Sequence, residues 1–246
     1  RLVARLPGAV AETAYAVGLE RMLILTGAAP VASWAPGARM RVSPATGRLL
    51  EVVLHDDPLF RETFSSAASL SEALGRERLD SGGLPERVAD FTARRLREDA
   101  RIASFSLGGW DTHAGQAQGL EQALRTLADT ILALRGGLGP VWDRTAVLCV
   151  TEFGRTVREN GSGGTDHGTG GAMLVAGGAI RGGRILGDWP GVAEADLYAG
   201  RDLLPTRDLR AVAGWAVRGL FGLSARQVEE DVFPGVDIGA DPGVLA

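Results

Sequence analysis

The second half of the chain alternates short apolar runs with stretches in which apolar residues have helical spacing. Residues 102–107, 146–150 and 172–176 are predicted strands, and the run 146–150 is apolar throughout, as in buried parallel sheets. Apolar residues that recur every three or four positions predict a helix that ends at Gly136-Gly137, namely Leu120, Leu124, Leu127, Ile131 and Leu134. Such alternation favours an α/β fold with a mostly parallel sheet flanked by helices.

The first hundred residues have a less regular pattern. Helices are predicted around residues 10–17, within 59–100 and over 207–220, short strands at 22–25 and 49–54, and a turn at 55–58. Pro85 suits a first helical turn, and Thr206 is the predicted N-cap of the last helix. We expect a single domain over residues 1–246, in which residues 1–100 supply packing and residues 101–246 carry the chemistry.

Composition narrows the classes of function. The chain has 246 residues, 45% hydrophobic and 23% charged, enough to bury one substantial core. Its net charge of −4 argues against a nucleic-acid partner, and no apolar stretch approaches the roughly 20 residues of a membrane span. The chain contains no lysine, which excludes lysine-based catalysis and Walker-type phosphate loops. Its single cysteine, Cys149, is a predicted core residue and allows no internal disulfide.

Two of the three histidines lie beside an aspartate in glycine-rich sequence, in Gly-Gly-Trp-Asp-Thr-His (108–113) and Gly-Thr-Asp-His-Gly (164–168). Imidazole and carboxylate on tightly turning backbone are the ligands that a zinc-type cation needs. Asp111 and His113 are two positions apart, so on extended backbone their side chains point the same way. Alternatively, Asp111 caps the following helix and His113 forms only local hydrogen bonds.

The second cluster lies within 161–171, where six of eleven residues are glycine. Glycines allow positive φ and close backbone approach, and a metal ligand would anchor such a loop. His167 is therefore a predicted ligand, and Asp166 either binds the ion or orients His167 from outside. A phosphate-binding loop is the alternative, but no Gly-Lys-Ser or Gly-Lys-Thr follows.

Glu152 and Arg155 follow the apolar run 146–150. A carboxylate at a buried strand end must be solvated, paired or metal-bound, because burial alone is too costly. Glu152 is thus either a metal ligand or the partner of Arg155. The planar guanidinium of Arg155 suits an anionic substrate, and the two roles are compatible. His55 has no comparable neighbours and is interpreted as a surface or packing histidine.

The chain resembles the bacterial domain-of-unknown-function family 1501, which belongs to the alkaline phosphatase/sulfatase-like superfamily. The resemblance is carried by LGGWDTHAGQ (107–116), by the stretch from VLCVTEFGRT to ILGDWPG (147–191) and by LLPTRDLRAVAGWAVRGLFGLS (203–224). Weaker similarity extends towards the N-terminus over nearly all of the chain. It implies an alkaline-phosphatase-like three-layer sandwich, in which Asp111, His113 and His167 bind one zinc ion and Glu152 contributes to a second. Asp166 is left as a ligand or as a neighbour that orients one.

The chain departs from that family's pattern in its first part. Members share an earlier Gly-Gly-x-Asp-Gly segment with a metal-ligand aspartate, and the superfamily's Ser, Thr or modified Cys nucleophile also lies upstream. Nothing before Asp111 matches either element, and Cys149 does not begin a sulfatase Cys-x-Pro-x-Arg signature. We therefore expect this sequence to correspond to the C-terminal two-thirds of such a protein, without the N-terminal strand unit.

The resemblance implies a hydrolase of small anionic phosphate or sulfate esters that uses one or two divalent cations, with zinc expected first. Arg155 is expected to hold a non-bridging oxygen of the substrate, and without the upstream nucleophile the site is expected to be partial. A periplasmic or secreted location is implied in the same way. The alternative is a non-catalytic, metal-stabilised domain that binds a ligand or a protein. A nucleotide-binding domain is disfavoured, because the glycines do not follow a strand–turn–helix order.

Overall fold

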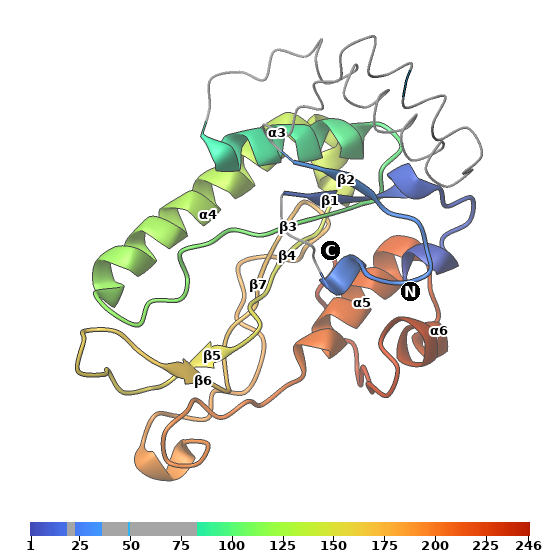
Figure 1. The fold of residues 1–246 in the computed structure, drawn as a ribbon. Coiled ribbons are helices and arrows are strands. Elements are labelled where there is room, and N and C mark those ends of the chain that lie inside the picture. The colour runs from blue at the N-terminus through green and yellow to red at the C-terminus, as the bar shows by residue number, and fades with distance from the viewer. Residues whose placement is uncertain (19–22, 36–48, 50–82) are drawn as a thin grey trace.

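The structure is a computed structural model that describes residues 1–18, 23–35, 49 and 83–246. It is a mixed α/β fold with a small parallel sheet, two short antiparallel ladders and helices (Figure 1). The turn at 55–58 with His55, and all but the first residue of the strand at 49–54, lie outside the described residues. Among the helices that the structure describes, none has both the length and the apolar character needed to cross a bilayer.

The parallel sheet has three strands in the order β2-β1-β3. Their bounds are β1 (Ala14–Val17), β2 (Ala32–Trp34) and β3 (Ile102–Phe105). The central strand β1 is parallel to both neighbours, and Tyr15 pairs with Ala32 on one side and with Ala103 on the other. The predicted strand at 102–107 is thus confirmed over its first four residues.

Two predictions in the first part of the chain are wrong. The expected helix over 10–17 is a 3-10 turn, η2 (Ala11–Thr13), followed by β1. Strand pairing on both edges and near-complete burial of Tyr15 and Val17 outweigh the helical propensity of the alanines. The described residues of the expected strand at 22–25 form another 3-10 turn, η3 (Leu23–Leu25), in which Ile24 is 76% exposed.

Helix α3 (Leu84–Arg97) packs on the sheet. Pro85 occupies its first turn, as predicted, because its fixed φ suits a helix start and its missing N–H has no partner there. Phe91 of α3 is fully buried and stacks on Trp34 of β2, with ring centroids 4.0 Å apart. Such a pair adds about 0.5–1.5 kcal/mol to the stability gained from area burial alone.

Helix α4 (Gln116–Leu138) lies against α3 and confirms the predicted helix, but it continues past the predicted end at Gly136-Gly137 (Figure 1). Of the predicted apolar face, Leu134 is buried, whereas Leu124 is 49% exposed. A Cβ on Gly137 would lie 2.7 Å from the Cβ of Ala93 in α3. This glycine therefore permits close approach of the two helices, and does not end one of them. The helix ends at Gly139, whose φ is +53°.

The remaining strands form two antiparallel ladders, where parallel pairing was expected. After the 3-10 segment η4 (Gly139–Arg144), β4 (Val147–Cys149) pairs with β7 (Leu174–Ala176), and β5 (Gly154–Arg155) pairs with β6 (His167–Gly168). Parallel neighbours need a crossover connection, usually a helix, whereas antiparallel neighbours do not. Between β4 and β7 the chain contains only loops and the β5–β6 hairpin, so antiparallel pairing results.

The C-terminal part follows a further 3-10 turn, η5 (Glu194–Asp196), and consists of α5 (Leu209–Phe221), α6 (Ala225–Gln227) and a π-helical turn, η6 (Val228–Val232). The N-cap of α5 is Asp208, not the predicted Thr206: the Asp208 side chain accepts a hydrogen bond of 2.8 Å from the Arg210 amide. The pKa of Asp208 is lowered, chiefly by a side-chain hydrogen bond from Arg210. The N-terminal 3-10 turn η1 (Val3–Arg5) is joined to η6 by an ion pair of Arg5 with Asp231.

Candidate metal centre

The loop between β3 and α4 carries Asp111 and His113 on one side and Thr112 on the other. Thr112 is buried, and its hydroxyl donates a hydrogen bond of 3.0 Å to the side-chain oxygen of Gln116. Asp111 and His113 are exposed, and Asp111 Oδ1 lies 3.0 Å from His113 Nε2. Both ligand candidates therefore lie on the same side, as predicted, although the backbone turns here: the amides of Thr112 and His113 donate to the carbonyls of Trp110 and Asp111.

The glycine-rich loop before β6 packs on this segment and delivers His167. Its backbone is joined to the start of α4 by hydrogen bonds from Gly115 N to Ser162 O and from Gln116 N to Gly163 O. A third bond joins Thr165 N to Thr112 O. The two Asp/His clusters, far apart in sequence, thus lie side by side.

Close packing explains several of the glycines in this region. A Cβ on Gly164 would lie 2.3 Å from the His113 carbonyl carbon, and one on Gly168 would lie 2.5 Å from that of Arg155. On Gly154, a Cβ would lie 1.8 Å from Gly170 O. In these three cases backbone occupies the space that a side chain would need.

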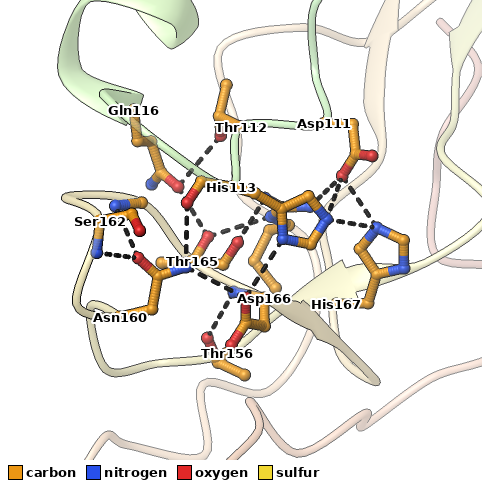
Figure 2. Close-up of polar contacts among 12 residues, drawn as sticks. Asp111, Thr112, His113, Gln116, Thr156, Asn160, Ser162, Thr165, Asp166 and His167 are labelled. Carbon is orange, nitrogen blue, oxygen red and sulfur yellow. Dashed lines mark hydrogen bonds and ion pairs between the residues drawn. The ribbon is translucent and has the colours of Figure 1, made fainter.

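Asp111, His113 and His167 face a common point (Figure 2). His167 Nε2 lies 2.8 Å from Asp111 Oδ1, and the two histidine Nε2 atoms are 3.1 Å apart. Within the part of the chain that the structure describes, this is the one group of three or more His, Cys, Asp or Glu side chains so arranged. The structure therefore brings together three of the five candidate ligands.

The three donor atoms fit a divalent cation. Ligand distances of about 2.0–2.1 Å from zinc place the atoms of a tetrahedral site about 3.3 Å apart. The separations of 2.8–3.1 Å among these donor atoms are shorter than that value by about 0.5 Å or less, so a small outward movement of the side chains would admit the ion. Three protein ligands with an open fourth position are typical of catalytic zinc sites. The side chains are 47–56% exposed, so the open position faces solvent.

Asp166 lies next to His113 and not at the common point. Its Oδ1 is 3.1 Å from His113 Nδ1, the ring nitrogen that faces away from the other two side chains. An ionised carboxylate only accepts hydrogen bonds, so Asp166 stabilises a proton on Nδ1, and Nε2, which faces Asp111 and His167, would then present its lone pair to a cation at the common point. The pKa of Asp166 is lowered, first by a hydrogen bond from Asn160 and then by one from His113. Asp166 thus orients a ligand histidine, although the sequence pointed to His167 as the one it would orient.

Arg155 is paired with Asp111. In the β5–β6 ladder Arg155 lies directly opposite His167, and its Nη1 donates to Asp111 Oδ1 at 2.6 Å. Its Nε and Nη2 donate to the hydroxyl and the carbonyl of Thr165, at 3.0 Å and 2.5 Å. The pKa of Asp111 is lowered, first by the hydrogen bond from His167 and then by that from Arg155. Both aspartates are therefore held in the ionised form that metal binding requires.

Glu152 stands apart from this group. It is exposed, lies between β4 and β5, and is not among the three side chains that converge. Two roles were considered for Glu152: a metal ligand beside these residues, or the partner of Arg155. Within the described residues, no contact of Glu152 corresponds to either role.

Other neighbours of the site had no clear signal in the sequence. The ring of Phe153 stacks on His167, with centroids 3.7 Å apart and an interplanar angle of 20°. Arg201 donates from Nη2 to the His167 carbonyl at 2.8 Å, and is itself paired with buried Asp202. The one available signal was Asn160, since Asn-Gly-Ser is a typical turn sequence whose side chain hydrogen-bonds nearby backbone.

Comparison with known families matches residues 65–232, about two thirds of the chain, to the family described as protein of unknown function (DUF1501). The chain belongs to this family. The resemblance to DUF1501 drawn from the sequence motifs is thereby confirmed, and the matched range contains every residue of the candidate metal centre. No curated protein and no solved structure matches the chain.

Proposed function

We propose that this DUF1501 chain forms the metal-binding part of a hydrolase that acts on phosphate or sulfate esters. The observation that carries the proposal is the convergence of Asp111, His113 and His167 on one point, next to a fixed guanidinium. A cation site and an arginine side by side form a binding place for a tetrahedral anion.

Each residue has a distinct role in this proposal. Asp111, His113 and His167 hold the ion, with zinc expected first, and Asp166 keeps His113 in the tautomer that can bind it. When bound, a divalent cation supplies Lewis acidity and lowers the pKa of a coordinated nucleophile. Arg155 uses three of its N–H groups on Asp111 and Thr165, and a guanidinium has further donors for a substrate oxygen.

The finer assignments rest on the resemblance. The order of Asp111, His113, Glu152 and His167 along the chain agrees with that of the alkaline phosphatase/sulfatase-like superfamily and supports a three-layer sandwich in the complete protein. A second ion at Glu152 would need ligands other than the converging three. The nucleophile is proposed to lie in an upstream segment, and a periplasmic or secreted location is proposed on the resemblance alone.

Metal analysis and ester turnover test the proposed function. The purified chain is expected to retain about one equivalent of zinc or a similar divalent metal per molecule. A version extended by its upstream gene sequence is expected to hydrolyse aryl phosphate or aryl sulfate esters. Metal binding without turnover of either ester would support the non-catalytic domain instead. Metal content far below one equivalent after incubation with zinc would overturn both readings.

Arg155→Ala is expected to weaken the binding of inorganic phosphate to the zinc-loaded chain by about 10-fold or more, because hydrogen bonds to charged groups contribute about 1.5–3 kcal/mol. Titration calorimetry measures the dissociation constant, and zinc content is determined on the same sample. The matched control is Arg158→Ala, which removes an exposed arginine that pairs only weakly with Glu194, at 3.4 Å. Equal phosphate affinity in both variants would exclude Arg155 from anion binding.

A further inference from the structure

The side chain of Asn160 takes part in the polar contacts around His113 (Figure 2). Its Oδ1 accepts hydrogen bonds from the amides of Ser162 and Gly164, at 2.9 Å and 3.1 Å. Its Nδ2 donates to the His113 carbonyl and to Asp166 Oδ1, both at 3.0 Å. Both ends of the amide are therefore fully used, which fixes its orientation.

These four bonds join the glycine-rich loop to the site. The acceptor side closes the turn over residues 160–164, which a further bond from Asn160 N to Gly164 O completes. The donor side holds the backbone of His113 and the carboxylate of Asp166 at the same time. The oxygen of Asp166 that Asn160 holds is the same one that accepts from His113 Nδ1.

We propose that Asn160 is a positioning residue that fixes Asp166 against His113 Nδ1 and so directs the Nε2 lone pair of His113 to the point shared with Asp111 and His167. This inference deepens the proposed function and rests on it for its effect on metal affinity. The contact of Asp166 with His113 Nδ1 is present without a metal, so its dependence on Asn160 can be measured in the metal-free chain.

An amide is required at this position for a chemical reason. An aspartate at 160 would keep both acceptor bonds to the loop, but would place a carboxylate oxygen where Nδ2 now donates to Asp166. Two carboxylates at that separation repel one another, so Asp166 would move from its place beside His113. An alanine would remove all four bonds. The two substitutions therefore separate the closing of the loop from the positioning of Asp166.

The first test measures the tautomer of His113 in the metal-free protein. Because the chain has only three histidines, ¹⁵N-histidine labelling gives three imidazole spin systems, and His113→Ala assigns one of them. In the wild-type chain His113 Nδ1 lies 3.1 Å from Asp166 and Nε2 lies 3.0 Å from Asp111, and the fixed carboxylate of Asp166 is expected to hold a proton on Nδ1. In Asn160→Ala and Asn160→Asp, the proton is expected to shift from Nδ1 towards Nε2, where Asp111 remains as its acceptor. Unchanged Nδ1 protonation in Asn160→Asp would overturn the inference. This variant alone decides the test if Asn160→Ala does not fold.

The second test measures zinc affinity. Residues that orient a metal ligand typically contribute about 10–100-fold to metal affinity, and Asn160→Asp is expected to lose that much. The matched control is Ser162→Ala, in the same loop. This substitution keeps the backbone amide that donates a hydrogen bond to Asn160 Oδ1. Affinity and tautomer should both remain at wild-type values in that control. If the wild-type chain binds no zinc but the tautomer still depends on Asn160, the proposed function fails and the positioning role stands.

Discussion

His167→Ala is expected to lower the affinity of the chain for zinc by more than about 100-fold, since even a residue that only orients a ligand contributes about 10–100-fold. The substitution removes one of three donors and leaves His113 and Asp111, a pair two residues apart that cannot complete the site. It also removes the hydrogen bond that does most to lower the pKa of Asp111. Competition against a chelator of known affinity measures the loss, and metal content after dialysis provides an independent readout.

His55→Ala is the matched control for this substitution. It removes the chain's remaining histidine, which lies outside the described residues. Unlike His167, His55 does not lie in a glycine-rich stretch. This variant should bind zinc as the wild-type chain does. If His55→Ala and His167→Ala lost the metal equally, or neither did, the ion would not be held by the three converging side chains.

Gly154→Ala is expected to reduce the free energy of unfolding by about 3 kcal/mol or more, at or above the upper end of the usual cost of overpacking. Gly154 is buried at the start of β5, and an added Cβ would lie 1.8 Å from the carbonyl oxygen of Gly170. Backbone cannot rotate away as a side-chain end can, so the β5–β6 ladder would have to open. Urea unfolding followed by circular dichroism measures the change, and zinc affinity should fall with it because the ladder carries Arg155 and His167.

Gly161→Ala is the corresponding control in the neighbouring loop. A Cβ at Gly161 would meet nothing within 4 Å, and the residue is not among those with positive φ. Its free energy of unfolding should change by no more than about 0.5 kcal/mol. A large loss for this variant, or none for Gly154→Ala, would show that the close packing around β5 does not constrain the chain.

Local pattern was enough to predict some of these features. The helix α4 could be predicted because its apolar residues recur with helical spacing over several turns. Asp111 and His113 are so close in sequence that any extended backbone places them together. The third converging residue, His167, was predicted from the surrounding sequence. A histidine within a run of glycines suggests that a metal ligand fixes an otherwise flexible loop.

Other features depend on contacts between distant segments and have no local signature. The strand β1 lies in an alanine-containing stretch that suits a helix, and only pairing with β2 and β3 makes it a strand. The partner of Arg155 depends on the β5–β6 register and on the approach of Asp111 from another loop. Asn160 and His113 are 47 positions apart, so nothing in the sequence links them.

Exposure of the ligand side chains has a kinetic consequence. Because about half of each ligand side chain is exposed to water, a chelator can coordinate the ion while the protein still binds it. Metal would then leave by an associative route, at a rate that rises with chelator concentration. Any covering segment supplied by a longer form of the protein would slow that exchange, even if it added no ligand.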